Sequence, residues 1–131
     1  LQQMDYIPGK LFSVNNKTVN YIPNLFSRNE RVVTIFQTEF GKVAIILVGA
    51  MLVGSIHTSW AGCINPTHAQ LINSICYPDE KSITLNKGEE IGLFQMGSTA
   101  IILLEQQNIQ WVKAIAAEQQ VRLGQKLAEL G

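Results

Sequence analysis

A Gly-Ser-Thr tripeptide at residues 97–99 stands between two apolar segments that are expected to be strands. Ser98 directly follows the carbonyl of Gly97, and glycine lets the backbone adopt conformations that are closed to other residues. In a strained turn, the Ser98 hydroxyl could act as an internal nucleophile on that carbonyl. On its own, however, the tripeptide is more typical of an ordinary tight turn.

Other common catalytic and metal-binding patterns are absent from the sequence. It contains no Gly-rich phosphate loop, no His-Glu-x-x-His motif and no Gly-x-Ser-x-Gly elbow. His57 and His68 have no obvious carboxylate partner nearby, which favours surface or strand-end positions. Cys63 and Cys76 lack zinc-ligand spacing and are expected to be reduced, mostly buried thiols. The sequence therefore predicts no metal site.

The composition excludes several classes of protein. The 131 residues are enough for one core but not for two, so residues 1–131 are expected to form a single domain. Ten basic and ten acidic residues balance, charged residues make up 15% and hydrophobic residues 47%. Such a chain is not disordered, and it lacks the cationic excess of a nucleic-acid binder. It also lacks a polybasic cluster that would hold it on an anionic membrane by charge alone.

The elements that must position Ser98 are predicted to be mainly short strands joined by Gly and Pro turns. Residues 31–37, a turn at 38–41 and the apolar run 43–56 predict a hairpin whose second arm is a buried strand with a glycine bend or bulge. That run is shorter than the roughly 20 residues of a transmembrane helix. This pattern is typical of a mainly β sandwich or barrel. Further strands are expected at 11–14, 82–85, 91–96 and 100–104, the last of them buried, with a turn at 86–89.

Residues 114–130 are ambiguous, because they are rich in helix-forming residues but are interrupted by Gly124. A glycine within a helix costs about 1 kcal/mol relative to alanine. The first residues, Leu-Gln-Gln-Met, show no signal peptide and favour an origin inside a longer protein.

Several short motifs follow one another in a specific order between Tyr6 and Leu104. An ordered set of this kind is far more specific than any one of its members. The motifs are 8–15, 22–33, 48–50, 53–56, 60–62, 87–92 and 96–99. The set closely resembles the C-terminal part of the phosphatidylserine decarboxylases of the bacterial membrane type.

In that family, the Gly-Ser bond of a Leu-Gly-Ser-Thr motif breaks itself. The motif reads Met96-Gly97-Ser98-Thr99 in this chain, which exchanges one apolar residue for another. The resemblance implies that the Ser98 hydroxyl converts the Gly97 amide to an ester, and that elimination then leaves Ser98 as an N-terminal pyruvoyl group. Residues 1–97 would be the end of a β chain and residues 98–131 the α chain. Thr99 is carried over as a neighbour within the motif.

The resemblance also implies a reaction, the decarboxylation of phosphatidylserine to phosphatidylethanolamine in phospholipid biosynthesis. Loss of carbon dioxide leaves a carbanion, and no ordinary side chain supplies the electron sink that it needs. The pyruvoyl carbonyl would supply it. Arg28 and Arg31 could help to hold the lipid phosphate, although an ion pair with Glu30 or another carboxylate is at least as good an explanation.

The family's activating Asp and His residues and its membrane-binding helices belong upstream of this chain. Asp5, Asp79, His57 and His68 do not stand in matching contexts, so the chain resembles the last two-fifths of the enzyme and is not expected to be active alone. The implied partners are the N-terminal remainder, in an α/β heterodimer that could itself dimerise. The implied location is the cytoplasmic side of the membrane, as a peripheral protein.

The family further implies a fold similar to the barrel-sandwich domains of biotinyl and lipoyl carriers. In those domains, a Val-x-x-Gly-x-x-Leu pattern such as Val121–Leu127 marks a turn and a short strand, which argues against a long C-terminal helix. Two alternatives stay open. One is a non-catalytic β-sandwich binding module of the same ancestry, in which Ser98 is a turn residue. The other is a pyruvoyl decarboxylase of a small amino acid, against which the motif at 22–33 argues.

Overall fold

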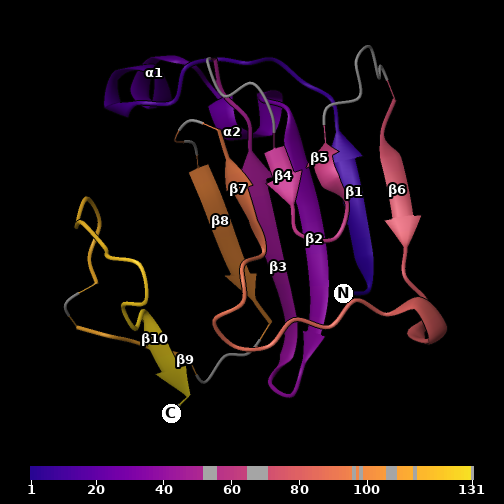
Figure 1. Cartoon of the computed structure of the whole chain (residues 1–131). Helices are drawn as coiled ribbons and strands as arrows, with labels where there is room; N and C mark the ends of the chain where they lie inside the picture. The colour runs from indigo at the N-terminus through magenta and orange to yellow at the C-terminus, as the bar shows by residue number, and fades with distance from the viewer. Residues whose placement is uncertain are drawn as a thin grey trace.

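The computed structural model describes residues 1–51, 56–64, 71–95, 97, 99–105, 109–113 and 115–130 (Figure 1). None of the helices in these ranges has the length and hydropathy of a membrane-spanning segment. The strands are β1 (Gln3–Ile7), β2 (Arg31–Thr38), β3 (Gly41–Val48), β4 (Ile56–Thr58), β5 (Gly62–Ile64), β6 (Asn73–Cys76), β7 (Gly92–Phe94), β8 (Thr99–Leu104), β9 (Ile109–Trp111) and β10 (Ala128–Leu130). The helices are α1 (Asn16–Tyr21), α2 (Leu25–Arg28) and the 3-10 helix η1 (Asp79–Lys81).

A five-stranded antiparallel sheet with the order β6-β1-β2-β3-β8 forms the larger layer. The hairpin predicted from the sequence is confirmed, because β2 and β3 pair along their whole length and Thr38 lies opposite Gly41. The Thr38 hydroxyl donates a hydrogen bond to the Gly41 carbonyl at 2.8 Å. Gly41 has a φ of 102°, which strongly favours glycine and explains the residue at this turn.

A three-stranded sheet, β5-β4-β7, lies over one face of the larger sheet (Figure 1). The core between the two layers consists of Met4, Tyr6, Val32, Leu47 and Ile56. This two-layer arrangement confirms the prediction of a mainly β fold. Trp60 packs against the same cluster, and its ring meets the Phe36 ring edge to face with centroids 5.8 Å apart.

The smaller sheet depends on a close backbone approach at Gly92. A Cβ atom at this position would lie 2.1 Å from the carbonyl oxygen of His57, closer than any real contact. Only glycine therefore lets β7 pair with β4 in the observed register. The turn predicted at residues 86–89 precedes this strand, and the Glu89 amide donates to the Asn86 carbonyl at 3.0 Å.

The strand predicted at residues 100–104 is confirmed as β8, but the expectation that it is buried is wrong. β8 is the last strand of the larger sheet, and among the described strands it pairs with β3 alone. Ile102 is 44% exposed and Leu103 57% exposed, on opposite faces of the strand. An apolar composition fits a buried central strand and an exposed edge strand equally well, so the sequence pattern did not distinguish them.

Three other strand predictions need correction. Residues 11–14 and 82–85 form no strand; the first segment is anchored instead by a bridge between Lys10 and Asn29. The apolar run does not continue as one strand, because β3 ends at Val48 and β4 begins at Ile56, and residues 52–55 lie outside the described residues.

Cys63 and Cys76 are exposed, which overturns the expected burial of the thiols.

The C-terminal segment forms no long helix in its described residues, as the Val121–Leu127 pattern predicted. A turn around Gly124, which has a φ of 78°, is closed by the Gln125 amide donating to the Arg122 carbonyl at 3.0 Å. The strand β10 begins at Ala128, three residues after Gln125, and pairs with β9 in a separate two-stranded ribbon.

Both α-helices lie near the end of the larger sheet where β2 begins (Figure 1). Neither helix was predicted from the sequence, because each spans fewer than seven residues. The signal for α1 is its capping box, in which the Asn15 side chain accepts from the Lys17 and Thr18 amides and Thr18 accepts from the Asn15 amide.

Asn29, which follows α2, is fully buried and ties three segments together. Its Nδ2 donates to the carbonyls of Phe12 and Gly49, and its Oδ1 accepts from the Phe12 amide, each at 2.9 Å. The side chain thereby joins the loop before α1 to the residue that follows β3. Because buried backbone groups without partners are costly, Asn29 fixes this end of the sheet.

We predict that Asn29→Ala destabilises the fold by about 3 kcal/mol, because it leaves the backbone groups of Phe12 and Gly49 unpaired. Urea denaturation followed by tryptophan fluorescence measures the change. Asn20→Ala, at an exposed position of α1, is the matched control and should change stability by less than about 0.5 kcal/mol. Equal stabilities of the two variants would contradict the role of Asn29.

Candidate functional site

The tripeptide singled out in the sequence lies at the start of the edge strand β8. Gly97 is exposed, and no described atom beyond its chain neighbours lies within 4 Å of the position that a Cβ would take. Thr99 is the first residue of β8 and lies opposite Val48, the last residue of β3. Met96 and Ser98 lie outside the described residues. The candidate scissile bond therefore falls immediately before a strand whose position is fixed by pairing.

Sheet pairing places Arg31, a predicted phosphate-binding residue, in the same row of paired residues as Thr99. Val48 lies opposite Thr99 on β8 and opposite Arg31 on β2. Neighbouring strands are about 4.8 Å apart, so the Cα atoms of Arg31 and Thr99 are separated by about 10 Å. Paired residues project on one face, so both side chains lie on the face opposite the one that carries Leu47.

The two arginines contact backbone carbonyls and an aromatic ring. Arg31 Nη1 donates to the carbonyls of Ser27 at 2.7 Å and of Asn29 at 3.1 Å. The Arg28 guanidinium lies 4.8 Å from the centroid of the Phe12 ring. Among the described residues, an ion pair joins Lys126 to Glu129, and none joins Arg28 or Arg31 to a carboxylate. The alternative explanation, an ion pair between these arginines and Glu30, is therefore not observed in that part of the chain.

Glu30 secures the same end of the sheet from the core side. Its carboxylate accepts a hydrogen bond from the buried Tyr6 hydroxyl at 2.8 Å, and its carbonyl accepts from the Gly49 amide at 2.8 Å. Burial raises the pKa of Tyr6 above its ordinary value, and the hydrogen bond to Glu30 and its charge add to the effect. No role for Tyr6 or Asn29 was predicted from the sequence. Their partners are distant in sequence, and Asn29 gave no signal beyond its place in the motif at 22–33.

The remaining candidates do not join this row. His57 lies in β4 opposite Cys63 and Leu93, and His68 lies outside the described residues. Asp5 accepts hydrogen bonds from the Gln3 side chain at 2.8 and 2.9 Å. No group of three or more His, Cys, Asp or Glu side chains in the described segments could hold a metal ion.

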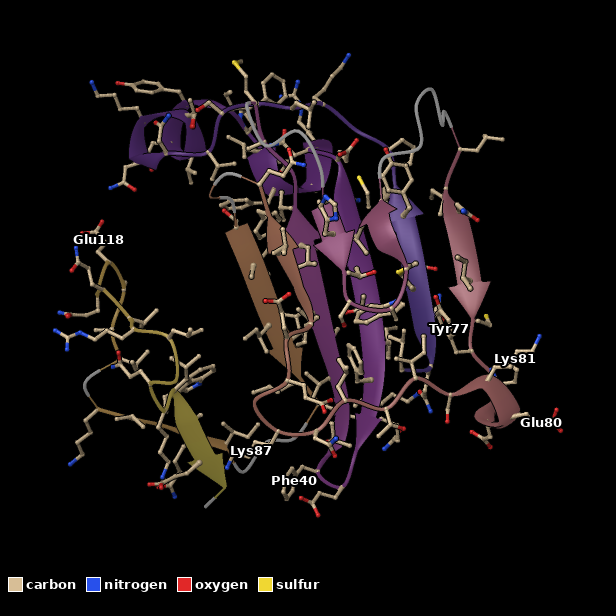
Figure 2. The ribbon with its side chains drawn as sticks, viewed as in Figure 1. Phe40, Tyr77, Glu80, Lys81, Lys87 and Glu118 are labelled. Carbon is tan, nitrogen blue, oxygen red and sulfur yellow. The ribbon has the colours of Figure 1, made fainter. Side chains whose placement is uncertain are left out.

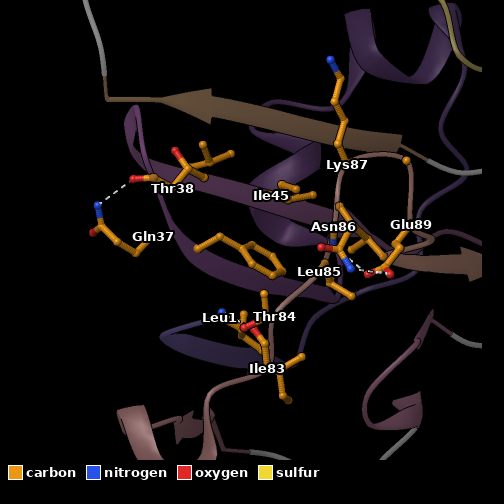
Figure 3. A pocket seen from close by; sticks show the side chains of 14 residues that line it. Leu1, Gln37, Thr38, Ile45, Ile83, Thr84, Leu85, Asn86, Lys87 and Glu89 are labelled. Atoms are coloured by element: carbon orange, nitrogen blue, oxygen red, sulfur yellow. Dashed lines mark hydrogen bonds between the residues drawn. The ribbon is translucent and has the colours of Figure 1, made fainter.

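A cavity of about 340 Å³ opens at the other end of the larger sheet (Figure 3). It lies between the β2–β3 hairpin and residues 83–91, and its lining includes Phe36, Val43 and Asn86. Val43 is five residues from Val48 along β3, a distance of roughly 17 Å at the rise of a strand. The cavity is therefore separate from the Gly97–Thr99 segment, and no residue predicted for the site lines it.

Comparison with known proteins identifies the family to which this chain is similar. A family model described as phosphatidylserine decarboxylase matches residues 1–129. The chain is 52% identical over 130 residues to a phosphatidylserine decarboxylase proenzyme of Nitrosococcus oceani, covering 99% of this chain and 42% of that protein. Proenzymes with the same name from Saccharophagus degradans and Pseudomonas putida are 47% and 49% identical, over 99% and 98% of this chain and 45% of each relative.

The chain therefore belongs to the phosphatidylserine decarboxylase family, which confirms the resemblance that the motif order indicated. It spans less than half the length of these relatives, and the match falls in their C-terminal part.

The Tyr6–Glu30 contact predicts a loss of stability in alkali. The pKa of Tyr6 is raised in the folded protein, so its contribution is complete below the unfolded value of about 10 and is lost as the pH rises above it. Denaturation between pH 9 and pH 12 should show a steeper fall in unfolding free energy for the wild type than for Tyr6→Phe. Tyr21→Phe, at an 84% exposed position, should keep the wild-type slope. An unchanged slope in Tyr6→Phe would refute the assignment.

Proposed function

We propose that this chain is the C-terminal part of a pyruvoyl-dependent enzyme that converts phosphatidylserine to phosphatidylethanolamine, with the pyruvoyl group formed at Ser98. The family match over residues 1–129 carries the proposal, because it includes the Met96-Gly97-Ser98-Thr99 motif. The relatives are named phosphatidylserine decarboxylase proenzymes, and a proenzyme is a precursor that is processed. The exposed Gly97 at the entrance to β8 supports the assignment of the processed bond.

In the proposed maturation, the Ser98 hydroxyl oxygen bonds to the Gly97 carbonyl carbon, and the C–N bond between the two residues breaks to give an ester. Elimination then releases Gly97 as a carboxylate and leaves a dehydrated residue 98, which takes up water and loses ammonia to become the pyruvoyl group. No described atom other than those of its chain neighbours lies within 4 Å of the Cβ position at Gly97, which supports this step, because activating Asp and His groups from the preceding part of the enzyme could approach there.

Cleavage at this bond would leave residues 98–131 as an α chain held by sheet pairing. Six residues of β8, Thr99 to Leu104, lie opposite residues Val48 to Val43 of β3. The new N-terminus would therefore sit one residue from a strand in a fixed position, as a reactive group requires. Once formed, the pyruvoyl group supplies the electron sink for decarboxylation. An α/β heterodimer, and a dimer of such heterodimers, is the proposed assembly.

For the substrate, we propose that Arg31, with Arg28, binds the phosphate of the lipid headgroup. A guanidinium fork matches two phosphate oxygens, and Arg31 shares a row and a face with Thr99 at about 10 Å. A headgroup held at that distance could extend its amine and carboxylate toward residue 98. Because the substrate is a membrane lipid, we place the enzyme as a peripheral protein on the cytoplasmic side of the membrane.

In the full-length proenzyme, Ser98→Ala should abolish both self-cleavage and decarboxylation, because alanine offers no hydroxyl for the ester step. Denaturing mass spectrometry of the wild type should show a fragment 98–131 that is blocked at its N-terminus and reacts with carbonyl reagents. Ser59→Ala, at an exposed loop position, is the control and should mature normally. Cleavage that persists in Ser98→Ala would exclude the mechanism. A wild type that stays intact would favour a non-catalytic module.

The two chains should stay together after cleavage because of the β3–β8 ladder. Ile101 is half-buried opposite the buried Ile46, so Ile101→Asn should weaken the association by about 2 kcal/mol. The matched control is Leu103→Asn, on the same face of β8 but 57% exposed, with an expected change below about 1 kcal/mol. Size-exclusion chromatography of the cleaved enzyme in increasing urea measures the release of the α chain. Equal urea midpoints for the two variants would contradict this role of the ladder.

A further inference from the structure

Charge is unevenly distributed along this neutral chain. Residues 8–31, which include α1 and α2, contain four of the ten basic side chains but one of the ten acidic ones. The acidic one is Glu30, which accepts the hydrogen bond from Tyr6. Lys10, Lys17 and Arg28 are exposed. The end of the sheet where β8 begins therefore carries an excess of positive charge.

Apolar side chains protrude from this same end. Tyr21 is 84% exposed on α1, on the same side of the helix as Lys17 four residues earlier, while Leu11 and Met51 are 45% and 58% exposed on the segments beside the helices. No residue of α1 is buried, so its capping box rather than packing holds the helix in place. Figure 1 shows α1 extending beyond the larger sheet. A helix of this kind offers its side chains to a partner outside the described residues.

The opposite end of the sheet has a different character. Phe40, at the tip of the β2–β3 hairpin, is 48% exposed there. The nearby segments 39–42, 79–81 and 87–90 carry five acidic and three basic residues, so this end has no cationic excess. Figure 2 shows Phe40, Glu80 and Lys81 far from α1. Of the two ends of the sheet, only the α1 end therefore combines exposed apolar side chains with an excess of positive charge.

We infer that the α1 face, defined as Lys10, Leu11, Lys17, Tyr21 and Met51, rests on the surface of an anionic lipid bilayer. The inference rests on the proposed function, because phosphatidylserine both supplies the negative charge and is the substrate. Basic residues are attracted to such a surface, and tyrosine and aliphatic side chains favour its interface. Neither the basic residues nor the exposed apolar residues are numerous enough to bind the bilayer alone, so the two sets act together.

This orientation also explains how a membrane lipid reaches residue 98. Gly49 to Met51 leave β3 at the end where Thr99 enters β8, so the α1 face and the candidate site share one end of the sheet. With the α1 face on the bilayer, Arg31 and Gly97 would lie above the headgroups. A phosphatidylserine headgroup could then reach the site while its acyl chains stay in the membrane.

The test uses the full-length enzyme and vesicles of phosphatidylcholine with or without phosphatidylserine. Sedimentation should show that Lys17→Gln combined with Tyr21→Ser weakens binding to the phosphatidylserine vesicles by about tenfold, of which about fivefold comes from the lysine. The control combines Lys81→Gln with Phe40→Ser, the same side-chain charge and a similar exposed ring at the opposite end, and should bind like the wild type. Equal binding of both double variants would overturn the inference.

A second measurement separates this inference from the proposed function. Decarboxylation of a short-chain phosphatidylserine, dispersed as monomers without vesicles, should be the same in Lys17→Gln/Tyr21→Ser as in the wild type. If the wild type lacks this activity, the proposed function fails, whereas the vesicle result still tests the surface. If the variant fails to mature or loses the activity on monomers, the α1 face packs against the rest of the enzyme, and the inference is wrong.

Discussion

The antiparallel pairing of β3 with β8 is the constraint on which the candidate site depends. β3 is the strand that the two halves of the site share, because it pairs with β2, which carries Arg31, and with β8, which begins one residue after Ser98. Asn29 and Glu30 then hold Gly49, the residue after β3, by hydrogen bonds to its backbone. The site is therefore built on sheet register and buried polar contacts rather than on a deep cavity.

Local patterns were enough to predict the elements whose partners are close in sequence. The β2–β3 hairpin could be predicted because a turn at residues 38–41 joins two apolar segments, and the turn around Gly124 because glycine adopts its left-handed conformation easily. The candidate nucleophile Ser98 needed more than local chemistry. Its tripeptide is common in turns, and only the order of motifs along the chain distinguished it.

Features that depend on distant partners could not be predicted. β8 pairs with a strand more than fifty residues earlier, and its exposure follows from its place at the sheet edge, which composition does not encode. The role of Tyr6 depends on Glu30, and that of Asn29 on Phe12 and Gly49, so neither residue shows its partner locally. Cys63 and Cys76 are likewise exposed because β5 and β6, the short strands that carry them, are the end strands of their sheets.

The edge strand has a consequence for handling the protein. β8 contains six residues without a charge or a proline, and its outer backbone groups face no described strand. Natural sheets usually protect such an edge, because it can add a further strand from another molecule by backbone hydrogen bonds. Copies of residues 1–131 on their own would therefore tend to associate through this edge. Colloidal solubility, rather than the stability of the fold, would then limit the concentration at which the chain can be kept.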